Sequence, residues 1–396
     1  MAERVSADEV IAYRLAAHGL TERLDDDGTL EAAGRCAIQN SPPGSALLAL
    51  HARVRSVAAD RVDTLVADDK SLLQTWSLRG APFYFPTVDA AVFTTGVLPP
   101  AEDSLRHFIV GVEQSVDRLG MTVTDAVDLC GAEIGDVLAG RRLAITELGA
   151  ELAHRIGCRL PPKQRTVWDA EGPHAQGQPV GEAVVHFCLR ILTLQQVVCL
   201  TRRDGNKAPF ALVDDWIGRP VPDTDPQTAR AELLRRYLRC YGPSTRAHFA
   251  GWLGIRAGDV DPWWDLVADE MTPVDFGGPA WILTDDRDAL RSPPDAAGVR
   301  LLPPRDPYTQ MRDRETIVER RYHRDVWKNV GEPGMVLVDG TIAGAWRPRK
   351  RGRTLTLTIS TFAALPARHQ RSLQHEAEAI APLRGADAAA VEFDTW

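Results

Sequence analysis

Residues 228–254 read TARAELLRRYLRC-YGPST-RAHFAGWLG. Apolar side chains recur on one side of the first segment, which predicts an amphipathic helix over 228–240. The Gly242-Pro243 pair ends that helix, and the following Ser-Thr pair is a good N-terminus for the next one. Two extended pieces, 271–276 and 280–284, then flank a Gly-Gly pair. A helix, a tight turn, a second helix and a hairpin are typical of a winged helix-turn-helix.

The preceding residues repeat this order less clearly. Helical periodicity predicts helices in the first two hundred residues, at Ala7–Ala17, Leu30–Ile38, Ala46–Val54, Leu105–Arg118, Val123–Cys130, Ala144–Ile156 and Glu182–Leu192. Pro82–Pro86 is a short aromatic extended piece between helices. Val197–Leu200 and Phe210–Val213 around Asp204-Gly205-Asn206 predict a hairpin. Any helical protein with hairpins can be divided in this way, so the pattern alone leaves tandem winged helices as one of several interpretations.

The last block is mainly β. Met335–Val338 and Thr341–Trp346 flank Asp339-Gly340, which predicts a hairpin with a type I′ turn. Thr354–Ile359 alternates threonine with apolar residues, as a half-buried strand does, and a helix is expected over Ala367–Ala381. The intervening segment is expected to be a basic loop at a hairpin tip, able to reach DNA phosphates. Its cations are Arg347, Arg349, Lys350, Arg351 and Arg353.

Composition limits the class of protein. The chain has 396 residues, a formal net charge of −8 and 44% hydrophobic residues, as in globular proteins. Residues 299–353 nevertheless carry 13 basic and 7 acidic residues, which suggests one face built for an anionic partner. The chain has no secretory signal and no apolar run of membrane-spanning length, so we expect no membrane partner. Six scattered cysteines indicate reduced thiols and a cytoplasmic location.

Several stretches together resemble the tandem winged-helix DNA glycosylases of the AlkZ-like and YcaQ-like family. They occur in the family's order over most of the chain, at residues 35–54, 75–80, 235–245, 301–308 and 338–347. The resemblance implies a mostly α, α+β fold with three tandem winged helices around a concave DNA-binding face, and a small C-terminal β domain. The expected boundaries are 1–100, 101–225, 226–285 and 286–396.

The family's catalytic pattern is only partly kept. Members carry a Gln-x-Gln, His-x-Gln or Gln-x-Asp element, and the matching positions here are Gln39 and Ser41. Members also tend to read Arg-Gly-Thr-Leu-His, whereas this chain has Arg79 followed by Phe83 in place of the histidine. The resemblance thus assigns catalysis to Gln39 and Ser41, and we expect Arg79 to contact DNA with the basic segment.

Chemistry fits this assignment. An alkylated purine already carries positive charge, so its departure needs little protonation, but a water must be held against the oxocarbenium-like sugar. A glutamine amide can orient that water, whereas Ser41 can hold a water but cannot take its proton at neutral pH. An alternative role for Gln39 is a turn or N-cap contact before Pro42-Pro43.

Three functions remain open at this stage. The first is a DNA glycosylase acting on alkylated or cross-linked purines in double-stranded DNA, for repair or for self-resistance to a genotoxin. The second is a non-catalytic DNA-binding protein or regulator, and the third is a scaffold that binds or transforms a small molecule in a natural-product pathway. We expect no cofactor and no metal, because the histidines and cysteines show no ligand spacing.

Overall fold

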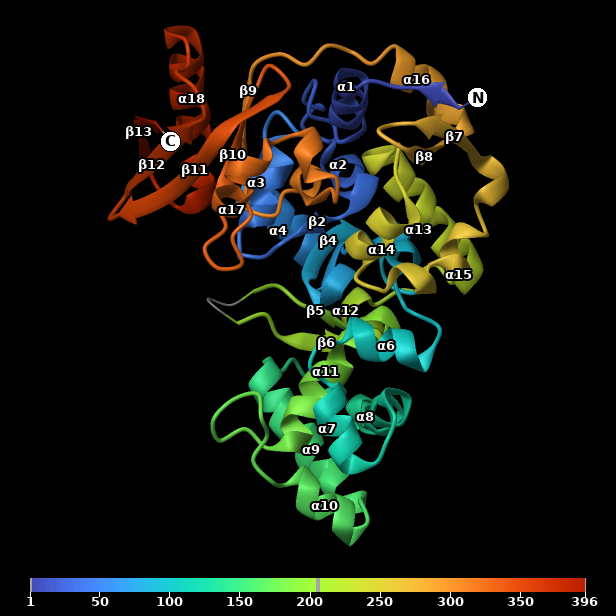
Figure 1. The fold of residues 1–396 in the computed structure, drawn as a ribbon. Coiled ribbons are helices and arrows are strands. Elements are labelled where there is room, and N and C mark those ends of the chain that lie inside the picture. Colours follow the sequence, from blue (N-terminus) through green and yellow to red (C-terminus); the bar gives the residue numbers. More distant parts are fainter. Residues whose placement is uncertain (1, 204–206, 396) are drawn as a thin grey trace. The chain divides into compact units, whose positions relative to one another are not determined.

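The computed structural model describes residues 2–203 and 207–395 (Figure 1). Helices predominate over several small sheets, which confirms the expected mostly α, α+β class. Two compact units interleave along the chain: a first unit of Met1–Val62, Leu234–Trp252 and Val267–Trp396, and a second unit of Asp63–Leu233 and Leu253–Leu266. Within the described residues, no helix combines the length and apolar character needed to cross a bilayer. The four expected domain boundaries stay a prediction.

The first unit begins with short helices. Ser6 and Glu9 form a capping box that starts α1 (Ala7–Ala17), with the Ser6 backbone N–H donating to the Glu9 carboxylate at 2.8 Å. Then follow α2 (Thr29–Cys36), β2 (Ile38–Gln39) and α3 (Ser45–His51). The three helices expected from periodicity in this region are therefore confirmed, with ends shifted by a few residues.

The winged-helix stretch has its expected elements. They are α13 (Pro226–Tyr241), α14 (Arg246–Leu253), β7 (Met271–Asp275) and β8 (Pro279–Leu283). The antiparallel β7–β8 hairpin has β1 (Glu3–Arg4) added in parallel beside β7. The turn after α13 is tied to the hairpin, because Ser244 and Trp281 exchange backbone hydrogen bonds of 2.9 and 2.8 Å. This part of the sequence prediction is confirmed.

The second unit contains a helical bundle and a small sheet. Its helices are α4 (Ala59–Ala67), which crosses the border with the first unit, α5 (Ala90–Phe93), α6 (Glu102–Phe108), α7 (Glu113–Leu119), α8 (Val123–Leu138), α9 (Ile145–Arg159), α10 (Pro162–Trp168), α11 (Val180–Leu194), α12 (Val213–Ile217) and α15 (Asp261–Trp264). Its strands β3 (Leu72–Trp76), β4 (Pro82–Pro86), β5 (Val198–Leu200) and β6 (Phe210–Leu212) have the order β4-β3-β5-β6.

One of two sequence predictions for the second unit is wrong and the other is confirmed. The single helix predicted over Leu105–Arg118 is wrong: α6 and α7 are separate, and Gly111 between them has a φ of +98° that no right-handed helix accommodates. The hairpin of β5 and β6 is confirmed. Its expected turn at Asp204-Gly205-Asn206 lies outside the described residues.

The C-terminal region is one five-stranded sheet covered by a helix. Strand order is β13-β12-β11-β10-β9, and the strands are β9 (Val299–Leu302), β10 (Gly334–Val338), β11 (Thr341–Arg351), β12 (Thr354–Thr361) and β13 (Ala388–Thr395). Helix α18 (Ala367–Ile380) packs its apolar side against one face, where Leu355, Leu357 and Ile359 are buried (Figure 1).

The basic segment between β11 and β12 differs from the expected loop. Strand β11 continues through Arg351, and the turn consists only of Gly352 and Arg353. Beyond Trp346, β11 pairs with β12 on one side and no longer with β10, whose register ends there. Four of the five cations therefore lie on a strand, where alternation sends neighbouring side chains to opposite faces, and Arg353 lies in the turn.

Candidate functional site

Gln39 is held on a strained connection in the first unit. Helix α2 ends at Cys36, and Ala37 then adopts a φ of +59° with a ψ of 155°, a conformation that a non-glycine residue rarely takes. This bend leads directly into β2, where Gln39 is only 3% exposed. Among the described residues, its buried Oε1 atom has no hydrogen-bond partner. Because an unpaired buried carbonyl oxygen costs folding free energy, it is a place where a water or ligand donor gains a bond.

The turn contact that was the alternative role for Gln39 is made by Asn40. Its Oδ1 atom accepts hydrogen bonds from the backbone N–H groups of Gly44 and Ala46, at 2.9 and 3.4 Å. Gly44 has a φ of +88° and precedes α3. Asn40 thus fixes the Pro-Pro-Gly turn and leaves Gln39 uncommitted. An asparagine four residues before this glycine is a local turn signal that sequence reasoning could have used.

Ser41 follows on the same segment and is half-buried. The structure thus brings Gln39 and Ser41 into one short segment between α2 and α3. The geometry gives them different positions, since the glutamine side chain is enclosed and the serine is partly open to solvent. Their catalytic roles stay a prediction.

A buried ion pair fixes the far end of α3. Arg53 donates from Nη1 and Nη2 to the two carboxylate oxygens of Asp306, both at 2.8 Å, and also to the carbonyls of Ala49 and His18. Burial lowers the pKa of the Arg53 guanidinium, but the Asp306 carboxylate more than reverses this, so its pKa lies above the usual value. Asp306 in the Arg-Asp-Pro-Tyr motif therefore has a structural role.

One buried group has metal-ligand chemistry. The donor atoms of His18, Cys36 and Cys240 lie within 4.8 Å of one another, with Cys36 Sγ 3.7 Å from His18 Nδ1. We call these three residues the thiol–imidazole cluster. The positive charge of Arg53 acts on Cys36, which disfavours a second cation, and His18 Nε2 has no outer partner among the described residues. The expectation of no required metal stays a prediction.

The positions Arg79 and Phe83 lie in the second unit. Phe83 is 4% exposed, on β4 opposite Thr75, so it is a core side chain without a polar group. Arg79 has a φ of +56°. A Cβ atom placed on Gly254 would lie 2.9 Å from its Cγ, so the Arg79 stem passes close to that glycine. The DNA contact expected of Arg79 stays a prediction.

The five cations of the basic segment do not act alike. Arg347, Arg349 and Arg351 are exposed and pair in register with Thr358, Thr356 and Thr354. Their side chains therefore lie on the face of the sheet opposite α18. We call these three residues the arginine row.

Lys350 and Arg353 are held differently. Lys350 shares its face with Leu355, and its Nζ donates to the Arg384 carbonyl at 3.3 Å. Arg353 forms an ion pair with Asp387, with Nη2 donating to Oδ1 at 2.6 Å. Of the five cations expected to be without acidic partners, only Arg353 has one among the described residues. Lys350 bonds a backbone carbonyl instead, which leaves the arginine row as the cations available to an anion.

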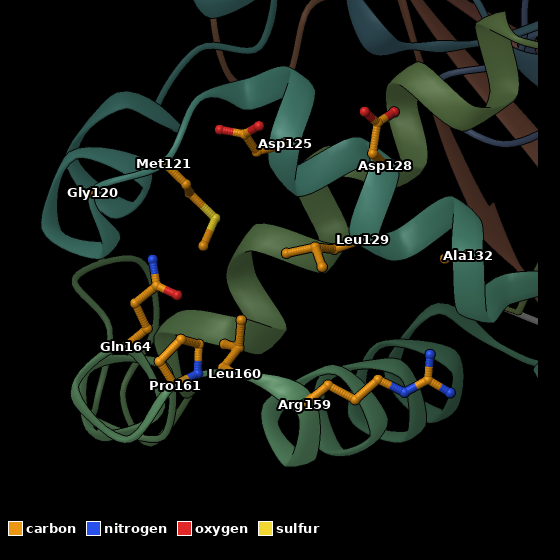
Figure 2. A pocket seen from close by; sticks show the side chains of 10 residues that line it. All are labelled: Gly120, Met121, Asp125, Asp128, Leu129, Ala132, Arg159, Leu160, Pro161 and Gln164. Atoms are coloured by element: carbon orange, nitrogen blue, oxygen red, sulfur yellow. The ribbon is translucent and has the colours of Figure 1, made fainter.

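A pocket of about 540 Å³ in the second unit lies between α8, α9 and α10 (Figure 2). Two of its polar groups have partners: Asp125 accepts from the Thr122 N–H at the start of α8, and Arg159 of α9 pairs with Glu133 of α8. Met121 and Leu129 add apolar lining. None of the predicted site residues lines this pocket.

Known proteins share the sequence pattern and the fold of this chain. The family model for DNA glycosylases of the AlkZ-like type matches residues 32–383. A curated relative from Streptomyces sahachiroi, named an interstrand DNA cross-link repair glycosylase, is 26% identical over 364 residues, with 87% of this chain and 88% of the relative covered. The solved structure of the Streptomyces sahachiroi DNA glycosylase AlkZ has a TM-score of 0.76 at 22% identity, and the match covers 99% of this chain and all of that one. This likeness of fold agrees with the tandem winged-helix layout, and the chain belongs to the AlkZ-like family of DNA glycosylases.

Proposed function

We propose that this protein hydrolyses the N-glycosidic bond of alkylated purines in double-stranded DNA, including bulky or cross-linked lesions. Family membership supports the reaction class, and likeness to the Streptomyces sahachiroi interstrand DNA cross-link repair glycosylase supports the lesion class. The observation that carries the proposal is the buried Oε1 of Gln39, which has no hydrogen-bond partner in the described part of the chain, beside an asparagine that makes the turn contacts instead.

In the proposed reaction, Gln39 Oε1 accepts a hydrogen bond from a water and aims its oxygen at the sugar C1′. The C1′–N bond breaks as the C1′–O bond forms, and the bonding electron pair neutralises the cationic base. The water proton passes to solvent, because an amide cannot keep it. Ser41 is a secondary partner of the same water, and no covalent enzyme intermediate is required.

DNA is held, in this proposal, by the arginine row. Its side chains are exposed on one face, and arginine binds phosphate oxygens with two donors at once. Arg79 is proposed as a further contact from the second unit. The local excess of basic residues over 299–353 supports a DNA-facing surface in an otherwise acidic chain.

The test compares Gln39→Ala with the parent on a duplex containing 7-methylguanine, under single-turnover conditions. Losing the group that orients the water should slow base release by roughly 100-fold, since such positioning is worth two or more orders of magnitude. Duplex affinity should barely change, because phosphate contacts dominate it. Ser41→Ala should slow base release less than Gln39→Ala does.

Two results would count against the proposal. An active parent with an equally active Gln39→Ala variant would remove Gln39 from the mechanism. A parent that binds the duplex but releases no base from any alkylated substrate would favour a DNA-binding protein without glycosylase chemistry.

A further inference from the structure

A second basic site lies in the first unit, away from the arginine row in sequence. A pocket of about 460 Å³ is formed by the segment that precedes α17 (His323–Val326) and by the first residue of that helix. The lining residues are Arg312, Asp313, Arg314, Glu315, Thr316, Arg320 and His323. Three arginines against two acids give this pocket a positive balance.

Its two acids already have partners. The Asp313 carboxylate accepts from Arg14 Nη1 at 2.7 Å and from Thr316 Oγ1 at 3.1 Å. Glu315 lies 3.7 Å from Arg320 at the exposed rim. Neither acid forms an ion pair with the other two arginines of the pocket.

Arg312 and Arg314 are therefore partly buried cations that form no ion pair among the described residues, and the only carboxylate charge acting on Arg314 there is that of Glu332. The Arg312 Nε atom is buried and has no hydrogen-bond acceptor there. Burial lowers the pKa of Arg312, and the positive charge of Arg314 lowers it further. Burial likewise lowers the pKa of Arg314, whose guanidinium lies 4.7 Å from the centre of the Trp327 ring.

The surroundings hold these side chains in place. The Arg312 stem passes 3.6 Å from where a Cβ on Gly251 of α14 would lie, so the helix backbone supports it closely. The Trp327 ring itself is fixed, because its Nε1 donates to the Thr309 carbonyl at 3.0 Å. Two such guanidiniums, held in place without an ion pair among the described residues, raise the folding cost that a bound anion would lower.

We propose that Arg312 and Arg314 form a binding site for a phosphate group. The two donors of an arginine fork match two oxygens of a phosphate, whereas chloride is a single atom and cannot be bound in this way. A backbone phosphodiester and a free phosphate ion share this chemistry. Assigning the site to a DNA phosphodiester rests on the proposed function, whereas the anion site itself does not.

The test uses the full-length protein and the variants Arg312→Gln and Arg314→Gln, with Arg320→Gln as a matched control at the exposed rim. Thermal unfolding is measured with inorganic phosphate against chloride at constant ionic strength. Binding of an undamaged duplex is measured by fluorescence anisotropy over a salt series. Arg312→Lys keeps the charge but loses the fork, and serves if the glutamine variant is poorly folded.

If a DNA phosphodiester occupies the site, each glutamine variant should weaken duplex binding about five- to tenfold and lower the salt slope by about one, and the control should match the parent. If free phosphate is the ligand, duplex binding should stay unchanged while the rise in melting temperature with phosphate disappears in the variants. No phosphate stabilisation of the parent together with unchanged duplex binding by both variants would overturn the proposal. A parent that binds phosphate but releases no alkylated base would refute the proposed function and leave this inference standing.

Discussion

The arginine row provides a quantitative prediction for DNA binding. Side chains two residues apart on β11 are separated by about 6.8 Å, so Arg347 and Arg351 span about 14 Å along one face. If each arginine neutralises one phosphate, the triple substitution of the row by glutamine should lower the slope of log affinity against log salt by about 2.7. The ratio of parent affinity to variant affinity should therefore be about 40-fold larger at 50 mM salt than at 200 mM salt.

The matched control is the double variant Lys350→Gln/Arg353→Gln. Its two cations lie on the same hairpin, but they are held by the Arg384 carbonyl and the Asp387 carboxylate. The assay is fluorescence anisotropy with an undamaged duplex at several salt concentrations, with unfolding curves to confirm that both proteins fold. An unchanged slope in the triple variant, or an equal loss in the control, would refute the assignment of DNA contact to the arginine row.

Four further predictions follow from the buried groups. Asn40→Ala removes both turn contacts and should lower the free energy of unfolding by about 1–3 kcal/mol in urea titrations; an unchanged midpoint would show that the turn does not depend on it. Arg53→Met should lower the free energy of unfolding by about 3–5 kcal/mol, because it leaves Asp306 buried without its partner. The double variant Arg53→Met/Asp306→Leu should recover much of this stability, and equal losses in the two variants would contradict that explanation. Burial raises the pKa of Glu376, but His51, whose Nε2 lies 3.6 Å from the carboxylate, and the positive charges of Arg23 and Arg300 lower it below its ordinary 4.5. The stabilising contribution of Glu376 is therefore full above pH 4.5 and lost as pH falls through the lower folded value. Glu376→Gln should flatten the acid limb of the stability curve, which a variant as steep as the parent would disprove. The thiol–imidazole cluster should hold no stoichiometric zinc or iron by elemental analysis, and base release should survive a chelator; bound metal together with chelator-sensitive activity would reverse this.

The parts of the fold that sequence reasoning predicted are those with local signals. The α13-to-β8 stretch was predictable because apolar periodicity, a Gly-Pro turn and a Gly-Gly hairpin all favour the same structure. The break between α6 and α7 was missed because apolar spacing continues through it, whereas the backbone leaves the helix at Ile109, with a ψ of 74°, and Gly111 has a positive φ. Strand β13 was missed because its pairing with β12 is parallel and follows a whole helix, so nothing local marks it.

The candidate site was predictable only in outline. The resemblance indicated the position of Gln39, but its uncommitted oxygen depends on Asn40 bonding two amides of a later turn. Dense charge favoured a loop over Arg347–Arg351, although pairing with β12 alone is enough to keep that exposed segment in a strand. The unpaired Arg312 has no sequence signal, since Arg-Asp-Arg-Glu suggests alternating ion pairs and only the contact of Asp313 with Arg14 leaves it without an acid.

The most direct test of the central claim is base release by the parent protein from a 7-methylguanine duplex, with the free base identified by mass spectrometry and abasic sites counted by alkaline cleavage. A monofunctional glycosylase predicts one free 7-methylguanine for each abasic site, with the DNA strand intact until alkali is added. A duplex that is bound with salt-dependent affinity yet yields neither free base nor abasic sites, with this lesion and with a cross-linked purine, would contradict the account.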